Sequence, residues 1–568
     1  MINSKKIIRD YAFNDETPKT LIDDNFYTGW PVVYVINDDK EMYIGETYHA
    51  PERMKQHLER EDRRRLSDLH IIGTSEFTKS ATLDIESSLI ELCKIENVRK
   101  LQNANDGLVN HHFANKAYFR KDSEFFAAIW KELKNRGLVE SDIELLLNSD
   151  IFKFSPYKSL NAEQCVTRDG ILQEILDCLT NNEKRTIFVN GSAGTGKTIL
   201  AIYLMKLLVT NAEYITDSED GNSDTLPFVE TVKEIKKIKP DLKVAYVVAM
   251  ESLRATLKEV FSHIDGLKKN MIIGPGEVTK SKYDVLIVDE AHRLKQRKNL
   301  ENGFVFTAFD ENNKKMGLDN NGTQLDWILK NSTVQILFYD AEQTIKPTDV
   351  NSERFNNLIN KKNNSIYLLS SQMRCIAGKD YINYVKNILN EKEENFIDFE
   401  DKYDFYLFDD INKFCNQILY KEKSDGLARI VSGYGFKWVS KKDPQKKDIK
   451  IENRDFYWNK KDKGWPLSIQ GNKVVDEIGC IHTIQGYDLN YCGVIFGPEI
   501  AYRNGKIVIF KENYYDINGK DGTDDSTLKK YILNIYATLL TRGIKGTYVY
   551  VCDDKLREYL AKYIKHYR

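Results

Sequence analysis

The chain has 568 residues, of which 41% are apolar and 11% aromatic, so global disorder is excluded and about three or four domains are expected. Its 83 Lys and Arg nearly balance its 85 Asp and Glu, so no overall basic excess indicates a nucleic-acid partner. The 8 cysteines form no C-x-x-C pair, no apolar signal core opens the chain and no run of about 18 apolar residues occurs. We therefore expect a cytoplasmic protein without a zinc ribbon, a disulfide framework or a membrane span.

The first part of the chain has the pattern of a β-hairpin followed by helices. Strands over 32–36 and 42–44 are separated by a short polar turn, which is hairpin spacing. Helices are predicted over 51–66 and 81–95. A helical linker is predicted over 121–150, so the first domain is expected to occupy residues 1–120.

From about residue 151, short apolar strands alternate with amphipathic stretches. These strands lie in RTIFVNG, KVAYVVAM, YDVLIVDEA, VQILFYDA, NSIYLL, GVIFG and TYVYVC. Such alternation predicts an α/β fold with a parallel sheet and crossover helices. Residues 211–228 are polar and acidic, and we interpret them as an exposed loop inserted in the first sheet domain.

An ATP site is predicted from the sequence GSAGTGKT, which follows the strand RTIFVN and precedes a helix. The glycines let backbone N–H groups approach phosphate oxygens, and the helix start adds a favourable dipole. Lys197 is expected at the β- and γ-phosphates, and Thr198 is expected to ligate Mg²⁺. The predicted ATP-binding residues of this loop are Gly191, Ser192, Ala193, Gly194, Thr195, Gly196, Lys197 and Thr198.

The strand YDVLIVDEAH ends in two carboxylates. We expect Asp289 to hold the hydrated Mg²⁺ and Glu290 to position or deprotonate the attacking water. The letters DEAH by themselves suggest a superfamily 2 helicase, but the motifs that follow resemble superfamily 1.

Four further segments resemble superfamily 1 motifs: LFYDAEQ, SQMRC, IHTIQGYDLN and YATLLTRGIKG. The resemblance makes Gln343 a sensor of the γ-phosphate and brings Arg374 and Arg542 to the transferring phosphoryl group. Upstream, LNAEQ resembles the adenine-reading Q motif, with Gln164 as the reader. This sequence departs from superfamily 1 at Tyr339, where Gly is usual before the motif III Asp.

A closer resemblance covers about residues 150–568. SPYKSLNAEQ, LARIVSGYGFKWVS and EIGCIHTIQGYDLNYCGVIFGPEI resemble the Schlafen-type DNA/RNA helicase-like domain of bacteria. The resemblance implies two RecA-like lobes, at 151–355 and 356–568, with ATP between them. Gln485 stands where motif V commonly has Lys, and the large inserted subdomains of processive helicases are not seen, so ATP hydrolysis is implied more strongly than processive unwinding.

The N-terminal part carries a second constellation. PVVYVI and MYIGET are followed by PERMKQH and LDIESSLIE, and this order resembles the GIY-YIG endonuclease family over about residues 28–110. A small α/β nuclease domain is therefore implied. Val32 stands where that family has Gly, away from the chemistry.

The GIY-YIG resemblance implies a metal-dependent phosphodiesterase site. Tyr34 would assist water activation, Arg53 would stabilise the anionic phosphate, and Glu86 would hold one metal ion, Mg²⁺ or alternatively Mn²⁺. Tyr43 and His57 would complete the pocket. The last motif residue is either Asn103 or Asn105, with Asn103 favoured.

Local basic and aromatic stretches leave alternatives open. The arginines of residues 63–65 could hold a phosphate backbone or form a solvated helix end. Tyr434, Phe436 and Trp438 could stack bases or form core.

The leading hypothesis is an ATP-coupled nuclease, in which a superfamily 1-type ATPase licenses cleavage of nucleic acid. DNA is the favoured substrate and RNA the alternative, no membrane partner is expected, and a homo-oligomer is left open. By analogy alone, a nuclease fused to an ATPase points to bacterial anti-phage defence. The competing hypotheses are a nucleic-acid-sensing ATPase switch with little translocation and an RNA-directed nuclease.

Overall fold

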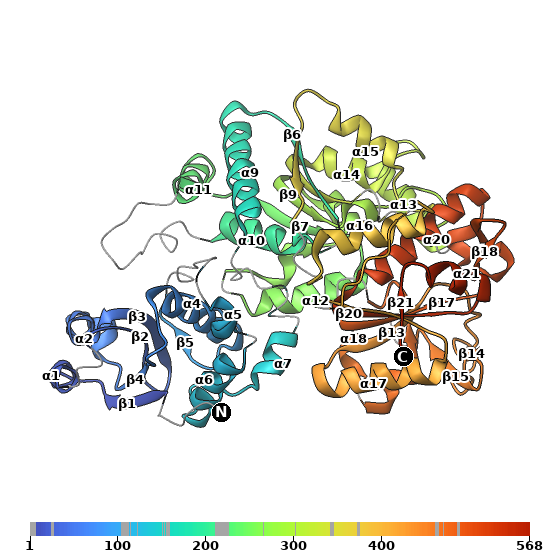
Figure 1. Cartoon of the computed structure of the whole chain (residues 1–568). Helices are drawn as coiled ribbons and strands as arrows, with labels where there is room; N and C mark the ends of the chain where they lie inside the picture. Colours follow the sequence, from blue (N-terminus) through green and yellow to red (C-terminus); the bar gives the residue numbers. More distant parts are fainter. Residues whose placement is uncertain are drawn as a thin grey trace. The chain divides into compact units, whose positions relative to one another are not determined.

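The computed structural model describes residues 7–23, 28–103, 113, 115–121, 123–149, 152, 154, 160–192, 194–210, 227–264, 266–300, 303–340, 343, 346–371, 375–392, 394–400, 402–460, 465–469, 471–484 and 489–568 (Figure 1). The chain forms two units. The first consists of Met1–Asn161, Thr210–Lys233 and Ser262–Gly266, and the second consists of Ala162–Val209, Glu234–Phe261 and Leu267–Arg568. Within the described residues, no helix is long and apolar enough to cross a membrane.

The first unit contains a five-stranded sheet in the order β1-β4-β2-β3-β5. The predicted hairpin is β2 and β3, which pair antiparallel and place Tyr34 opposite Gly45 and Ile36 opposite Tyr43. Both strands are longer than the apolar runs that predicted them. The strands are β1 (Ile8–Ala12), β2 (Thr28–Asn37), β3 (Glu41–His49), β4 (Asp68–Ile72) and β5 (Lys100–Leu101).

Helices flank this sheet, and the helix predicted over 51–66 is not continuous. The predicted helix over 51–66 is two helices, because the chain at Arg60 is extended (φ −94°, ψ 126°). The second predicted helix is α4, which begins where Thr78 Oγ1 accepts from the Ala81 N–H and ends at the left-handed Asn97. The helices are α1 (Thr17–Ile22), α2 (Ala50–Leu58), α3 (Glu61–Arg64), α4 (Lys79–Glu96), α5 (Lys116–Phe119), α6 (Glu124–Asn135) and α7 (Ile143–Asn148).

The expected linker over 121–150 packs as part of the first unit. Helix α6 buries an apolar face that includes Phe126, Ile129 and Trp130. Just beyond α6, Arg136 Nε donates to Asp10 Oδ1 of β1 at 2.7 Å. Residues 121–150 therefore belong to the N-terminal structure.

The second unit begins with a parallel six-stranded sheet in the order β11-β6-β10-β9-β7-β8. Its inner strands are buried along almost their whole length, which is why they appear in the sequence as continuous apolar runs. Strand β11 lies beyond the expected lobe boundary at 355, yet it pairs with β6, so this sheet extends to residue 369. The strands are β6 (Arg185–Gly191), β7 (Val244–Val248), β8 (Ile272–Ile273), β9 (Tyr283–Asp289), β10 (Ser332–Tyr339) and β11 (Ser365–Leu369).

Helices connect most of the strands of this sheet. Of the acidic loop expected at 211–228, residues 211–226 lie outside the described residues. The helices are α9 (Ala162–Asn181), α10 (Lys197–Val209), α11 (Pro227–Ile238), α12 (Glu251–Ser262), α13 (Gly303–Lys315), α14 (Gln324–Asn331) and α15 (Ser352–Ile359), with a short 3-10 helix, η4, at Pro275–Lys280.

A second, eight-stranded sheet follows in the order β14-β15-β16-β13-β17-β20-β12-β21. Its strands pair parallel except β14 with β15. The α/β fold with parallel sheets is thus confirmed. Strands β18 and β19 form a separate two-stranded sheet. The elements of this part of the chain are α16 (Gly378–Leu389), β12 (Asp404–Phe408), α17 (Ile411–Asp425), β13 (Ala428–Ser432), β14 (Ile449–Ile451), β15 (Arg454–Trp458), α18 (Trp465–Ser468), β16 (Glu477–Gly479), β17 (Leu489–Phe496), β18 (Ile500–Arg503), β19 (Lys506–Ile509), α19 (Ile517–Lys520), α20 (Asp525–Leu540), β20 (Gly543–Val551), α21 (Asp554–Leu560) and β21 (Lys565–His566).

Candidate ATP and nuclease sites

The phosphate-binding loop connects the buried strand β6 to helix α10. Gly194 and Gly196 have φ of 86° and 77°, a conformation that side chains with a Cβ rarely adopt. A Cβ at Gly191 would lie 2.6 Å from Thr195 Oγ1, so this position also requires glycine. Ala193 lies outside the described residues. The glycines therefore give this loop the tight turn and the accessible backbone N–H groups that phosphate binding needs.

Lys197 is directed into this loop. Its ammonium group donates to the carbonyl oxygens of Gly191 and Ser192, the latter at 3.0 Å, and its side chain is 6% exposed. Asp340, at the end of β10, lies 3.8 Å away. A buried cation held mainly by carbonyl oxygens can exchange them for phosphate oxygens.

The two predicted Mg²⁺ ligands of the ATPase lie in contact. Thr198 Oγ1 donates to Asp289 Oδ2 at 2.9 Å, and the Tyr246 hydroxyl donates to the same oxygen at 2.9 Å. Burial, together with the adjacent Glu290, raises the pKa of Asp289 to about 6. In the described parts of the chain no group of three or more His, Cys, Asp or Glu could hold a metal ion. The hydroxyl and carboxylate fit Mg²⁺ that keeps water and phosphate oxygens as its other ligands.

Glu290 has the unusual backbone conformation of φ 51° and ψ 47°. Its carboxylate lies 2.8 Å from His292 Nε2. Burial works to raise the pKa of Glu290, but His292 and Lys197 hold it below its ordinary value. The carboxylate is therefore ionised, as a group that accepts a proton from water must be.

Two of the predicted ATP-site glutamines hydrogen-bond to the phosphate loop and to the residue that follows β10. Gln164, fully buried at the start of α9, donates to the carbonyls of Thr195 and Gly196 at 3.3 and 3.4 Å. Gln343 Nε2 donates to Asp340 Oδ2 at 2.7 Å, while its buried Oε1 has no hydrogen-bond partner in the described part of the protein.

The two predicted arginines differ in what the structure describes. Arg542 is 3% exposed and precedes β20, where its carbonyl accepts from the Leu489 N–H at 3.3 Å. Arg374 lies outside the described residues, as does Gln485.

Four of the predicted nuclease residues form a single cluster on β2, β3 and α2. The Tyr34 hydroxyl lies 2.8 Å from His57 Nε2, and Arg53 Nε donates to that hydroxyl at 3.1 Å. The rings of Tyr43 and His57 are 4.9 Å apart between centroids. A Cβ at Gly45 would lie 2.3 Å from the Tyr34 oxygen, so only glycine leaves room for it.

One of these hydrogen bonds has a fixed direction. Arg53 Nε–H can only donate, so the Tyr34 hydroxyl accepts from it and can donate its own hydrogen to an unprotonated nitrogen of His57. Burial, with the charges of Arg53, Arg63 and Arg60, lowers the pKa of His57 to about 3. The imidazole is therefore neutral at physiological pH, and it can accept through Nε2 in the tautomer that carries its hydrogen on Nδ1.

The other predicted nuclease residues surround this cluster. Glu86 is half-buried on α4, a helix that packs against β2 and β3. Asn103 bonds the main chain of Ile44 in both directions, at 2.9 and 2.7 Å. Asn103 thus fixes β3 next to Tyr43, and the alternative Asn105 lies outside the described residues.

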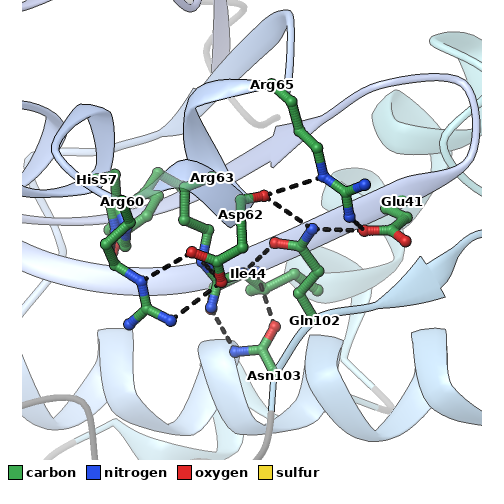
Figure 2. Close-up of polar contacts among 10 residues, drawn as sticks. Glu41, Ile44, His57, Arg60, Asp62, Arg63, Arg65, Gln102 and Asn103 are labelled. Carbon is green, nitrogen blue, oxygen red and sulfur yellow. Dashed lines mark hydrogen bonds and ion pairs between the residues drawn. The ribbon is translucent and has the colours of Figure 1, made fainter.

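The arginines of residues 63–65 differ in exposure, because Arg63 is buried whereas Arg64 and Arg65 are solvated and paired with acidic side chains. Arg63 is 1% exposed, Arg64 pairs with Asp15 at 2.9 Å, and Arg65 pairs with Glu41 (Figure 2). Tyr434, Phe436 and Trp438 were expected either to stack bases or to form core. They are partly buried and pack against the core of the second sheet, which favours the second alternative.

A cavity of about 460 Å³, which the sequence did not indicate, lies beside the carboxyl ends of β7 and β8. Its charged lining residues are Arg254, Glu277, Lys280, Lys295 and Lys315. They are spread over 62 positions of sequence, so no local basic run indicated them. None of the phosphate-loop residues lines this cavity.

Known proteins resemble this chain mainly through its second unit. Residues 184–553 match the family model described as Schlafen group 3, DNA/RNA helicase domain. The uncharacterized protein YPL245W of Saccharomyces cerevisiae is 26% identical over 446 residues, which cover 71% of this chain and 91% of the relative.

Solved helicase structures are also found. A complex of two coordinating Pif1 helicases at forked double-stranded DNA is 11% identical, with a TM-score of 0.26, and covers 69% of this chain and 92% of that chain. The DEAD-box helicase Mss116 bound to single-stranded RNA is 12% identical, with a TM-score of 0.29, and covers 71% of this chain and 75% of that chain. Similarity at this level carries no argument about function.

Proposed function

This chain belongs to the Schlafen group 3 DNA/RNA helicase family, and on that premise we propose that it is an ATP-dependent nuclease. In this proposal the second unit binds nucleic acid and hydrolyses ATP, and the first unit cleaves phosphodiester bonds. The observation that carries the nuclease half is the hydrogen-bonded chain from Arg53 through Tyr34 to His57.

The ATPase chemistry uses residues from neighbouring strand ends. Lys197 would leave the loop carbonyls for the β- and γ-phosphate oxygens, while Thr198 and Asp289 would hold Mg²⁺. A bound Mg²⁺ supplies charge neutralisation of the phosphates. Glu290 would take a proton from the attacking water, and Arg374 and Arg542 would offset charge on the transferring phosphoryl group.

In the nuclease centre, the proton path starts at water. The Tyr34 hydroxyl passes its hydrogen to neutral His57 as the tyrosine oxygen takes a proton from water, and the hydroxide attacks phosphorus. The P–O bond to the leaving oxygen breaks, and that oxygen takes a proton from solvent. Arg53 offsets the negative charge near the tyrosine oxygen and the phosphate. Glu86 would hold Mg²⁺ or Mn²⁺, which supplies Lewis-acid polarisation of the phosphate.

The cavity beside β7 and β8 supports a nucleic-acid partner. Its four basic side chains outnumber the one acidic side chain, and the Glu277 carboxylate already accepts from the Gly274 N–H at 2.7 Å. Cationic cavities of this kind attract phosphate backbones.

The proposed function is tested with purified full-length protein on single- and double-stranded DNA and RNA, with ATP and Mg²⁺. We expect stimulated ATP turnover, and cleavage that disappears in Tyr34→Phe. Preferential cleavage of RNA would favour the RNA-directed nuclease, and ATP turnover without any cleavage would favour the switch.

The nucleic-acid surface is tested separately by the double variant Lys280→Glu and Lys315→Glu. Binding should weaken, and the slope of log affinity against log salt should become shallower by about 2. The double variant Lys442→Glu and Lys446→Glu, which makes the same charge change at two exposed residues elsewhere in the same unit, is the control. Equal binding by the double variant and the control would reject the cavity as the contact surface. We also propose a biological role in anti-phage defence, which rests only on the combination of a nuclease domain with an ATPase domain in one chain.

A further inference from the structure

A buried arginine lies directly behind the nuclease cluster. Arg63 is on the short helix α3, and only 1% of it is exposed. Its guanidinium carbon lies 3.7 Å from the centre of the Tyr43 ring. Burying an arginine is costly unless its charge and hydrogens are satisfied, so its placement calls for a physical reason.

Two side chains, Gln102 and Asp62, lie against this guanidinium. Arg63 Nη1 donates to Gln102 Oε1 at 2.5 Å, and Arg63 Nε lies 3.8 Å from Asp62 Oδ2. Gln102 is itself fixed, because its amide donates to Glu41 Oε2 at 2.5 Å and to the Asp62 carbonyl at 3.2 Å. Figure 2 shows Gln102 beside Arg63, Asp62 and Glu41.

Direct contacts lead from this cation to the reacting hydroxyl. Arg63 stacks on Tyr43, the Tyr43 ring packs against His57, and His57 Nε2 lies 2.8 Å from the Tyr34 hydroxyl. Asn103 fixes the main chain of Ile44, the residue after Tyr43, through two hydrogen bonds.

We propose that Arg63 is a positioning residue of the nuclease centre: its buried guanidinium fixes the Tyr43 ring against His57 and thereby holds the imidazole in place to accept the Tyr34 proton. This inference rests on the proposed nuclease function. Arg63 does not touch substrate, because it is covered by protein.

The charge of Arg63 keeps the resting imidazole neutral but opposes imidazolium, so the expected fall in kcat on its removal comes from lost positioning of the ring. The charged and titratable groups around His57 are Arg53, Arg60, Arg63, Asp62, Tyr34 and Tyr43. The three arginines disfavour imidazolium, and Asp62 favours it. Removing one buried cation should therefore raise the pKa of His57 and leave its ring less constrained.

The test uses the full-length protein and two independent readouts: cleavage kinetics, and titration of His57 by NMR with the signal assigned from His57→Gln. Arg63→Met should lower kcat at least tenfold with KM nearly unchanged, and should raise the His57 pKa by about one unit or more. Arg64→Met, one residue away and 61% exposed, should change neither.

Arg63→Lys separates charge from stacking. It should restore the low His57 pKa but only part of kcat, since an ammonium group cannot stack as a planar guanidinium does. A folded Arg63→Met with wild-type kcat and unchanged His57 titration overturns the proposal. If Arg63→Met does not fold, Arg63→Lys decides: wild-type kcat overturns the proposal, and reduced kcat with an intact ATPase supports it. If the wild-type protein cleaves nothing, the nuclease function fails, while the His57 titration still tests the role of Arg63.

Discussion

The glycine of the second hairpin strand offers a sharp test of the nuclease cluster. In Gly45→Ala the new Cβ would meet the Tyr34 oxygen at 2.3 Å and its Cζ at 2.4 Å. Ordinary contact between such atoms needs about 3.5 Å, so the tyrosine ring must move by about 1 Å. Tyr34 is fully buried, and overpacking of this kind destabilises a protein by about 1–3 kcal/mol.

The same displacement should break the chemistry. The Tyr34–His57 hydrogen bond is 2.8 Å long, and a shift of about 1 Å carries it beyond hydrogen-bonding distance. A misplacement of this size can lower a rate about 100-fold. We therefore expect Gly45→Ala to lose cleavage while the ATP turnover of the other unit is retained.

The measurements are thermal unfolding, cleavage rate and ATP turnover on one preparation. Gly303→Ala is the control, because a Cβ at that position would meet nothing within 4 Å. A Gly45→Ala protein with the melting temperature and the cleavage rate of the control would refute the reasoning.

Further variants address the two sites separately. Lys197→Ala should abolish ATP turnover in a folded protein, and turnover near the wild-type rate would reject the predicted ATP site. The same variant tests whether ATP hydrolysis is coupled to cleavage: reduced cleavage would support the coupling, and unchanged cleavage would reject only the coupling. Glu290→Gln should bind ATP yet hydrolyse it at least 100-fold more slowly, since the amide cannot accept a proton; loss of nucleotide binding in an equilibrium assay would point to a structural role instead. Arg542→Ala should lower kcat much more than ATP affinity, and full activity would argue against its approach to the phosphates. Glu86→Ala should remove cleavage and spare ATP turnover, and unchanged cleavage would reject Glu86 as a metal ligand.

The sequence by itself determined most of the strands and the type of fold. Strands such as β6 and β9 are buried on both faces, so they appear as unbroken apolar runs that end in the predicted ATP-site residues Gly191 and Asp289. Local spacing likewise predicted the hairpin that pairs Tyr34 with Gly45. These features depend on neighbours in sequence, which is why they could be read from it.

Tertiary structure decided which residues meet and which charges are covered. Arg63 belongs to an arginine run that looks solvated, yet it is buried because Gln102 and Tyr43, from other strands or their ends, close over it. The basic cavity likewise gathers residues as far apart as Arg254 and Lys315. The helix predicted over 51–66 breaks at Arg60, because ion pairing with Asp62 and the burial of Arg63 outweigh local helix propensity there. Contacts between residues distant in sequence have no local pattern, and only folding brings them together.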